Sequence, residues 1–380
     1  MKYVQINAYS GGWADSIIFK KHRELQALGH ESWVFWARGD HEQDEYMQKI
    51  ASKAGVYLDA LQTRVDGRAS FHSRGATRRL LARLEEIDPD VVHLHVLLGY
   101  YINVEMLFEW LVSHRCRVVW TLHDCWAFTG HCYHFSYVNC EQWRFGCART
   151  EPCPQVHEYP ETILGGNRSV RWSYEQKKRL FTLLPADRMS LVAPSKWLAD
   201  LVAQSFLSKY AINIERNVVD TAVYHPVESD FKVAHGLGSK FMILGVASKW
   251  TERKGLFDFV RLASELDSKQ FAIVIVGLNE KQIEWVQKEQ LDIIALPRTS
   301  SLAQLVAIYS AADALFNPTL EDNYPTVNLE AQACGTPVVT YDTGGCRETL
   351  SLSRSVAVEG FSAACGAFRN LEKSQFELDD

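Results

Sequence analysis

The residues with the clearest chemical potential lie in Asn317–Val339, where the sequence reads NPTLEDNYPTVNLEAQACGTPVV. This pattern predicts a polar loop with two adjacent carboxylates, Glu321 and Asp322, before a helix that begins at Pro325 and carries Glu330 on its second turn. Proline suits the first helical turn because the N–H groups of that turn have no intrahelical partner. Such N–H groups can bind a phosphate, and an acid on the next turn can accept hydrogen bonds from a ribose. Asp322 and Glu330 could therefore hold opposite ends of a nucleotide sugar; the alternative is an ordinary strand–loop–helix with solvated acids.

A second group of chemically suited residues lies in the basic segment Gly245–Gly255, GVASKWTERKG. Lys249 and Lys254 could converge on a diphosphate, and Arg253 is a neighbour that could stand in for Lys249. Departure of a nucleoside diphosphate builds negative charge on its phosphate oxygens, which fixed cations stabilise without a metal. A solvated basic helix start is the less favoured alternative, because cations near a helix N-terminus oppose the helix dipole.

A histidine and an aspartate, His123 and Asp124, come just after a buried strand in the segment VWTLHD. Asp124 could orient the imidazole by accepting a hydrogen bond from one ring nitrogen, or the pair could simply cap the following loop. His93 and His95 alternate with apolar residues on the preceding strand. We assign neither, because at least one of them is expected to be a core residue.

Glycines mark the ends of several predicted strands. Gly11 and Gly12 follow the first strand, where a backbone without a Cβ can approach a diphosphate or an acceptor closely; a tight turn is the alternative. Gly277 ends a later strand, and Leu296–Thr299 follows the next one.

Four of the nine cysteines occur in a loop rich in His, Trp and Tyr: Cys132, Cys140, Cys147 and Cys153. Four thiols in one short segment of a cytosolic protein favour a structural zinc over disulfides, and His131 and His134 could substitute as ligands. The intervening stretches of seven, six and five residues lack the C-x2-C pattern of a zinc knuckle. Free cysteines that pack a long loop are therefore an equal alternative.

The composition is that of an ordinary globular protein, with 380 residues, 47% of them hydrophobic and 23% charged. This length allows two domains with separate cores, and the formal net charge of −6 argues against a nucleic-acid-binding protein. No run of about 18 apolar residues and no signal-peptide pattern is found, so the cytoplasm is the expected location. The basic and aromatic stretch Arg168–Phe181 could lie on anionic lipid at the inner face of the cytoplasmic membrane, although a helix packed on the sheet is the favoured interpretation.

Apolar runs of strand length alternate with helical patterns, which is typical of parallel sheets covered by helices. Asn217–Pro226 resembles the end of a first domain, and a polar stretch leads to a new strand. We expect an α/β protein with two domains, residues 1–222, including the cysteine-rich loop 125–160, and residues 223–380. The expected helices include Ala14–Leu28, Ala69–Ile87, Gly165–Leu184, one capped by Ser195, and Phe361–Leu371. The expected strands are Lys2–Asn7, Glu31–Ala37, Val91–Val96, Arg117–Leu122, Met189–Ala193, Lys240–Ala247, Phe271–Val276, Asp292–Ala295, Ala314–Phe316 and Pro337–Tyr341.

These motifs, in this order, resemble the family 4 retaining glycosyltransferases across nearly the whole chain. That family carries two glutamates with seven residues between them, around a Phe-Gly pair, followed by A-x-G-x-P-V; here Asp322 and Glu330 supply the acids and Ala333–Val338 supplies the tail. Asp322 is one methylene shorter than the usual glutamate, so Glu321 could substitute for it. Pro325 replaces a glycine and removes one backbone donor. The Asp-Asn-Tyr-Pro form resembles a subgroup of colanic-acid and O-antigen transferases.

The resemblance implies a GT-B fold, in which two Rossmann-like domains face each other across a cleft that binds ligands at the carboxyl ends of the strands. It implies that the first domain binds the acceptor and the second binds a UDP- or GDP-linked sugar. The terminal helix that usually crosses back to the first domain is expected to be absent or shortened.

The resemblance also assigns roles to residues. It implies catalytic roles for His123, which would face the donor sugar, and for Lys249, Lys254 and Asp322. Acceptor-side positions would be Asp124, Tyr100 and Tyr101. The donor contacts that it implies are Gly11, Gly12, Arg253, Gly277, Arg298, Glu321, Asn323, Tyr324, Pro325, Thr326, Val327 and Glu330.

The expected function is retaining transfer of a sugar from a nucleotide-diphosphate sugar to a saccharide acceptor, expected to be lipid-linked, in surface polysaccharide biosynthesis. No second carboxylate is evident for the anomeric carbon, which fits front-face substitution, in which the departing phosphate takes the acceptor proton and no metal is required. Two alternatives stay open: a nucleotide-sugar epimerase of the same fold, and a sugar-nucleotide-binding subunit that has lost catalysis, which Pro325 and the short C-terminal end suggest.

Overall fold

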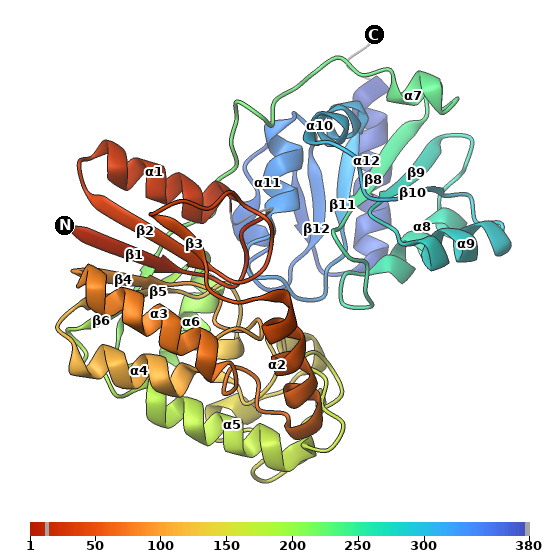
Figure 1. Ribbon diagram of the computed structural model, residues 1–380. Coiled ribbons are helices and arrows are strands. Elements are labelled where there is room, and N and C mark those ends of the chain that lie inside the picture. The colour runs from red at the N-terminus through yellow and green to blue at the C-terminus, as the bar shows by residue number, and fades with distance from the viewer. Residues whose placement is uncertain (12–14, 377–380) are drawn as a thin grey trace. The chain divides into compact units, whose positions relative to one another are not determined.

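The structure is a computed structural model that describes residues 1–11 and 15–376. Its contacts divide the chain into two compact units, Met1–Arg216 and Asn217–Asp380, which we call the N-terminal and C-terminal units (Figure 1). Each unit is built on one wholly parallel sheet. Gly12, a predicted donor contact, lies outside the described residues.

The N-terminal unit contains a seven-stranded sheet of order β3-β2-β1-β4-β5-β6-β7. Figure 1 shows α3, α4 and α5 on one face of this sheet and α1 on the other. The strands are β1 (Lys2–Ile6), β2 (Glu31–Trp36), β3 (Met47–Lys49), β4 (Val91–Leu94), β5 (Arg117–Thr121), β6 (Met189–Ala193) and β7 (Ala211–Ile214). The helices are a π-helix (Asp15–Phe19), α1 (Lys20–Ala27), α2 (Lys53–Asp66), α3 (Arg74–Ile87), α4 (Val104–Ser113), α5 (Gly166–Phe181) and α6 (Lys196–Ala203), with 3-10 turns at Trp126–Phe128, Ser136–Val138 and Gln142–Arg144.

Continuous apolar strands form this sheet because both of its faces are covered. Along β2, Val34 and Trp36 pack with Phe19 on one face, whereas Trp33 and Phe35 point to the other face and join the main core. Alternate side chains of one strand thus enter two different cores.

The C-terminal unit has a six-stranded sheet of order β10-β9-β8-β11-β12-β13. One apolar cluster, with Phe259 and Phe368, packs α8 and α12 on one face; another, with Tyr309 and Ala331, packs α10 and α11 on the other. The strands are β8 (Phe241–Val246), β9 (Phe271–Val276), β10 (Ile294–Leu296), β11 (Ala314–Asn317), β12 (Val338–Tyr341) and β13 (Val356–Val358). The helices are α7 (Phe231–Ala234), α8 (Leu256–Glu265), α9 (Glu280–Lys288), α10 (Leu302–Ala311), α11 (Thr326–Ala333) and α12 (Phe361–Phe376), with a 3-10 turn at Arg347–Thr349.

Every predicted strand is present, with ends that differ by at most two residues, and Ser195 caps α6 by accepting a hydrogen bond from the Leu198 N–H (3.1 Å). The helix predicted from Ala69 begins only at Arg74, because the preceding Ser73 has a left-handed backbone conformation (φ 47°). Elements that the sequence did not predict include β3, β7, β13, α2 and α4. Within the described ranges, no helix combines the length and apolar character that crossing a membrane requires.

Candidate active site

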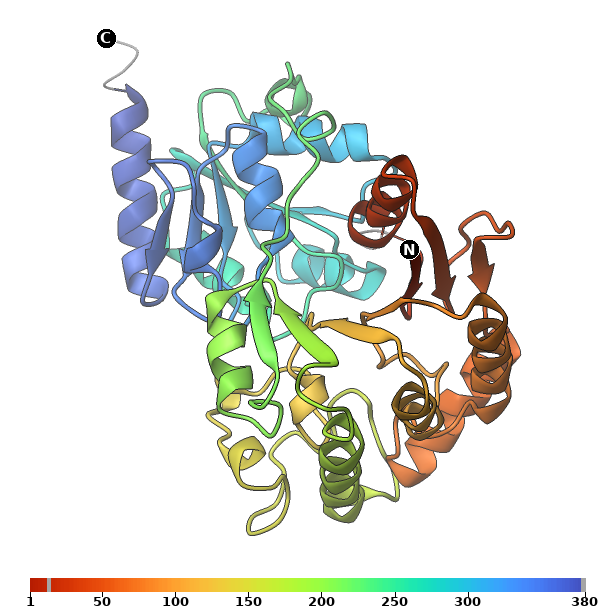
Figure 2. The same cartoon turned by 90° about the vertical axis from the view of Figure 1, so that its left-hand side faces the viewer.

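The C-terminal sheet has a topological switch point at its centre. Strand β8 pairs with β9 on one side and with β11 on the other, so the loops that follow β8 and β11 leave the sheet toward opposite sides. Figure 2 shows this unit, coloured green to blue, from a second direction. Ligands of open α/β sheets bind in the crevice outside such a point. The basic loop before α8 and the acidic loop before α11 both begin here, which brings the two strongest sequence motifs together.

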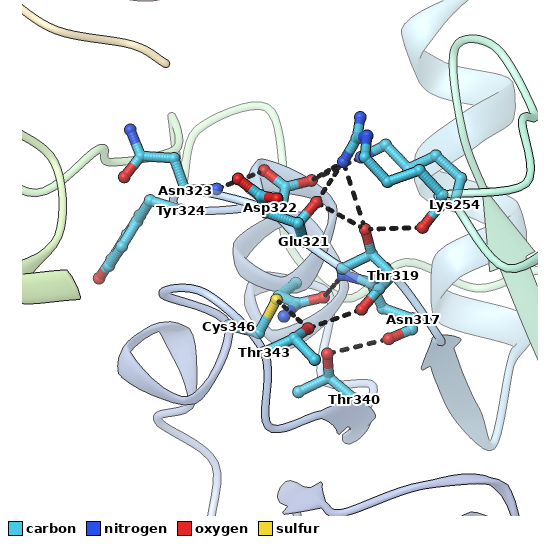
Figure 3. A network of polar contacts seen from close by, with 12 residues as sticks. Lys254, Asn317, Thr319, Glu321, Asp322, Asn323, Tyr324, Thr340, Thr343 and Cys346 are labelled. Atoms are coloured by element: carbon cyan, nitrogen blue, oxygen red, sulfur yellow. Dashed lines mark hydrogen bonds and ion pairs between the residues drawn. The ribbon is translucent and has the colours of Figure 1, made fainter. Parts of the chain in front are cut away.

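The charged residues of these loops form one network (Figure 3). Lys254 Nζ donates to Asp322 Oδ2 at 2.5 Å, and the Arg253 guanidinium lies 4.0 Å from the same oxygen. Arg253 also donates to the Glu321 carbonyl. The three charged side chains are only 16–25% exposed, so water screens them incompletely. One carboxylate thus lies beside two cations at the carboxyl ends of the central strands.

Backbone contacts fix the loop that carries the acids. The Leu320 N–H donates to the Arg253 carbonyl (2.8 Å), and Thr319 Oγ1 donates to the Glu321 carbonyl (3.0 Å). Thr319 is fully buried. Arg253 therefore contacts the acidic loop through both its backbone and its side chain.

A glycine turn after β12 also belongs to this network, and the sequence interpretation had not included it in the site. Gly344 has a φ of +57°, and a Cβ on it would lie 2.0 Å from the Asp322 carbonyl oxygen. The Gly345 N–H donates to that same oxygen (2.9 Å), and Thr343 Oγ1 donates to the Thr319 carbonyl (2.6 Å). The signal that could have revealed this turn is a Thr-Gly-Gly sequence that begins two positions after the end of a predicted strand.

Helix α11 begins one residue later than predicted, because Pro325 is its N-cap with an extended ψ of 118°. The backbone N–H groups of Thr326 and Val327 therefore occupy the first two helical positions, where no intrahelical partner exists. Glu330 follows on the second turn, and its Oε2 accepts a hydrogen bond from the Tyr309 hydroxyl (2.9 Å). Burial raises the pKa of Glu330 above the usual carboxyl value.

Asn323 and Tyr324 point away from the Asp322 cluster (Figure 3). Both side chains are buried, and the Tyr324 hydroxyl donates to the Glu348 carbonyl (3.2 Å). These contacts anchor the loop between β11 and α11 to the 3-10 turn after β12.

The loop after β9 requires glycine. Gly277 has a φ of +95°, and a Cβ there would lie 1.8 Å from the Ala247 carbonyl oxygen, so no other residue fits this backbone. Its N–H donates to the Leu296 carbonyl (3.1 Å), which joins the ends of β9 and β10. The other predicted donor contact here, Arg298, is exposed after β10, and Lys249 is exposed on the loop after β8.

The N-terminal sheet has a second switch point, where β1 lies between β2 and β4. Asn7, just after β1, accepts a hydrogen bond from the Val96 N–H after β4 (3.1 Å). A Cβ on Gly99 would approach the Ala8 Cβ to 2.7 Å, so the two loops are closely packed. Gly11 lies further along the same loop and is exposed, and no atom of the residues that the structure describes lies within 4 Å of a Cβ built on it, its chain neighbours aside.

Three histidines gather at the ends of β4 and β5; His95 is buried, and His93 and His123 are half-buried. His95 Nδ1 lies 3.3 Å from His123 Nε2, and the His93 ring stacks on that of His95 with centroids 4.1 Å apart. His93 Nε2 in turn contacts Thr121 Oγ1 (2.8 Å). Burial lowers the pKa of His123 to about 4 and that of His93 to about 3. All three rings are therefore neutral at pH 7, and in the His95–His123 contact one ring donates to the other.

Asp124 caps the turn that follows β5, because its Oδ1 accepts from the Trp126 N–H (2.8 Å). Burial raises its pKa above the usual carboxyl value. The contact shown for the His123 ring is His95, which had been left unassigned, rather than the predicted Asp124. His95, His123 and Asp124 all line one small pocket.

The two predicted acceptor-side tyrosines differ in environment. Tyr101 is fully buried and donates its hydroxyl to the Val96 carbonyl (2.8 Å), which makes it a core residue. Tyr100 has a left-handed backbone (φ 62°), and its ring lies edge-on to that of Tyr159, with centroids 5.7 Å apart.

The cysteines do not assemble the predicted zinc site. Cys132, Cys147 and Cys153 are buried in the main core, Cys140 packs against it, and no disulfide links them. Among the residues that the structure describes, no three His, Cys, Asp or Glu side chains are grouped so that they could hold a metal ion. The thiols lie near enough to one another to affect each other's pKa, but burial is the main cause of the shifts, and it raises the pKa of Cys147 to about 12. The substitute ligand His131 contacts the Glu158 carbonyl instead (3.0 Å).

Two doubly wound parallel α/β units, with charged loops at a strand-end switch point, define a GT-B glycosyltransferase architecture. Comparison with known proteins gives the family. The model of Glycosyltransferase Family 4 matches residues 18–223, and that of Glycosyl transferases group 1 matches residues 228–364. The chain belongs to Glycosyltransferase Family 4.

Individual relatives are distant. A putative colanic acid biosynthesis glycosyl transferase, WcaC of Escherichia coli K12, is 25% identical over 278 residues, which cover 70% of this chain and 63% of that protein. The D-inositol 3-phosphate glycosyltransferase of Corynebacterium jeikeium is 33% identical over 125 residues, 29% of each chain. The chain thus spans less than two thirds of the length of these relatives.

Solved structures share the fold over nearly the whole chain. Sucrose-phosphate synthase from Thermosynechococcus elongatus has a TM-score of 0.67 and 15% identity, and covers 97% of this chain and 89% of its own. HepE of Anabaena in complex with UDP and glucose has a TM-score of 0.63 and 15% identity, with 99% and 91% covered. WaaG, a glycosyltransferase involved in lipopolysaccharide biosynthesis, has a TM-score of 0.61 and 14% identity, with 98% and 90% covered.

Proposed function

We propose that this chain is a retaining glycosyltransferase that moves a sugar from a nucleotide-diphosphate sugar to a saccharide acceptor carried on a lipid, in surface polysaccharide biosynthesis. The observation that carries the proposal is the Arg253–Lys254–Asp322 network at the switch point of the C-terminal sheet. Two cations beside a helix N-terminus form an anion site that suits a diphosphate. The UDP complexes of HepE, a protein of the same fold, support this class of donor.

We assign the donor to the C-terminal unit and the acceptor to the N-terminal unit. Lys254 and Arg253 would stabilise the negative charge that develops as the nucleoside diphosphate leaves. The N–H groups of Thr326 and Val327 would receive a phosphate, and Glu330 would accept hydrogen bonds from the ribose. Asp322 would keep both cations in place and, when the diphosphate draws Lys254 away, would be available to the sugar hydroxyls.

The proposed reaction proceeds on one face of the sugar. The acceptor oxygen forms the new bond to the anomeric carbon as the bond to the departing phosphate breaks, and that phosphate takes the acceptor proton. The role left to the protein is positioning and charge stabilisation. His123, neutral because burial lowers its pKa to about 4, would donate to or accept from a sugar hydroxyl rather than transfer a proton at neutral pH.

The experiment that tests this proposal measures the thermal unfolding temperature with UDP, GDP, ADP, CMP and their sugar conjugates. Stabilisation by one nucleotide and its conjugates is expected, together with release of that nucleotide when a lipid-linked saccharide acceptor is added. Binding without release across a panel of acceptors would favour a sugar-nucleotide-binding subunit. If no nucleotide stabilises the protein, the donor assignment is wrong.

A further inference from the structure

The two ring nitrogens of His95 have different surroundings. The side chain is 2% exposed, and its Nδ1 lies 3.3 Å from Nε2 of His123. Its Nε2 is also buried, and among the residues that the structure describes it has no hydrogen-bond partner. Burial lowers the pKa of both rings, so that at pH 7 each is neutral and carries one ring proton. In the contact between them, one ring must therefore donate and the other must accept.

The two possible directions of this hydrogen bond leave different groups of His95 unpaired. If His95 accepts at Nδ1, its proton lies on Nε2, and a buried N–H group has no partner. If His95 donates from Nδ1, only the lone pair of Nε2 is unpaired. In folded proteins, buried N–H groups without a partner are rarer than under-satisfied carbonyl acceptors, and a buried donor without a partner costs its full desolvation free energy. Donation from His95 to His123 is thus the favoured direction.

The surroundings of His95 hold its ring in this orientation. The His93 ring stacks on it, with centroids 4.1 Å apart and an interplanar angle of 28°. The His95 backbone N–H donates to the Ile6 carbonyl (2.9 Å), and its carbonyl accepts from Trp120 Nε1 (3.0 Å). Both the backbone and the ring of His95 are therefore fixed, so that Nδ1 stays directed at His123.

We propose that His95 is a positioning residue that donates from Nδ1 to Nε2 of His123 and so keeps the ring proton of His123 on Nδ1. A neutral imidazole has one N–H group, and the hydrogen bond at one nitrogen sets what the other nitrogen can do. His123 would therefore act as a hydrogen-bond donor toward the sugar, for which an oxygen is a suitable partner and an ammonium group is not. The contact with the sugar rests on the proposed function; the position of the ring proton does not.

The position of the proton can be measured in the wild-type chain. The experiment is a two-dimensional ¹H–¹⁵N correlation spectrum of the full chain, labelled with ¹⁵N in the rings of its 13 histidines. The signals of the two rings are identified as those lost in His95→Asn and in His123→Asn. We expect both rings to carry their proton on Nδ1 at pH 7. A proton on Nε2 of either ring overturns the proposal.

Two substitutions of His95 separate the hydrogen bond from the packing. The amide group of His95→Asn can take the place of Nδ1 and donate to His123, whereas His95→Leu has no donor. His123 should stay protonated on Nδ1 in His95→Asn and become a mixture of both tautomers in His95→Leu. The matched control is His22→Leu, which removes another buried imidazole of the N-terminal unit (3% exposed), one whose Nδ1 contacts Ser32 Oγ (2.9 Å). This control should leave the His123 signals unchanged.

Binding of the nucleotide that stabilises the protein, with and without its sugar, tests the role toward the sugar. His95→Leu should bind the nucleotide sugar about fivefold more weakly, the net contribution of about one hydrogen bond, and the nucleoside diphosphate alone within about twofold of the wild type. His95→Asn and His22→Leu should bind both ligands like the wild type. Equal losses for both ligands in His95→Leu, or a His95→Asn variant as defective as His95→Leu, would show that His95 contributes packing only. Urea unfolding of each variant checks that it is folded.

The two kinds of measurement keep two failures apart. If no nucleotide sugar binds, the proposed function is wrong and the role toward the sugar is lost with it, while the wild-type spectrum still decides whether His95 sets the tautomer of His123. If nucleotide sugars bind but the proton lies on Nε2, only the positioning role is wrong.

Discussion

Replacement of Lys254 by alanine tests the proposed diphosphate site most directly. Lys254 Nζ lies 2.5 Å from Asp322 Oδ2, with the two side chains 25% and 18% exposed. The C-terminal unit contains a closely matched ion pair at the amino ends of the strands of the same sheet. Lys232 Nζ lies 2.5 Å from Asp313 Oδ2, and the two side chains are 24% and 10% exposed. Asp313 immediately precedes β11, whereas Asp322 follows it, so only the Lys254 pair lies at the carboxyl ends of the strands.

Lys254→Ala and Lys232→Ala should differ strongly in turnover but little in their free energy of unfolding. Each partly exposed pair should contribute about 1 kcal/mol or less to the free energy of unfolding. A cation 4 Å from a phosphate charge gains about 4 kcal/mol at an effective dielectric constant of 20. Part of this gain is lost because Lys254 must leave Asp322, so we expect the nucleotide Kd to rise only about tenfold. In the transition state the charge on the leaving group is larger, and loss of one fixed donor should lower kcat by about 10²–10³-fold.

The assay is steady-state release of the nucleoside diphosphate, with urea unfolding of the same preparations. Lys254→Ala should lose turnover while Lys232→Ala keeps it within about twofold, and both should unfold at similar urea concentrations. Two results would refute the reasoning: turnover by Lys254→Ala within a few-fold of the wild type, or equal losses in both variants. The second result would mean that general destabilisation, rather than charge at the strand ends, controls the rate.

Two further substitutions test the structure around the sites. Gly277→Ala should lower the free energy of unfolding by about 1–3 kcal/mol or more and weaken nucleotide binding, because its Cβ would meet the Ala247 carbonyl oxygen at 1.8 Å; Gly236→Ala, which has a similar positive φ (63°) but open space, should cost only the backbone strain in the same urea titration. Burial lowers the pKa of Lys177, which donates to the Trp126 carbonyl, to about 7. The unfolded chain therefore binds more protons than the folded one between pH 7 and about pH 10.4, and this residue's contribution to stability rises with pH through that window. Urea unfolding at pH 7 and pH 9 should show the wild type gaining stability relative to Lys177→Met; an unchanged difference would mean that Lys177 is charged in the folded protein.

The sequence by itself determined the architecture and the chemical type of the proposed donor site. Continuous apolar strands such as Phe271–Val276 alternate with amphipathic helices, and only a parallel sheet covered on both faces buries both. The motifs around Lys254 and Asp322 were recognisable because their residues are local in the chain. Their physical meaning, cations and acids at strand ends, follows from the strand boundaries.

Only the tertiary structure decided the features that depend on contacts between segments distant in the chain. The pairing of His95 with His123 and the packing of Gly344 against Asp322 join residues that are 28 and 22 positions apart, and no local pattern specifies them. The four cysteines share a loop in sequence but not a ligand geometry in space. Helix α2 was not predicted, and even a correct helix prediction would have placed its leucines in the core, because periodicity shows that a helix has an apolar side but not which side faces the solvent. Here the buried Asp59–Ser73 contact sets that orientation and leaves Leu61 outside.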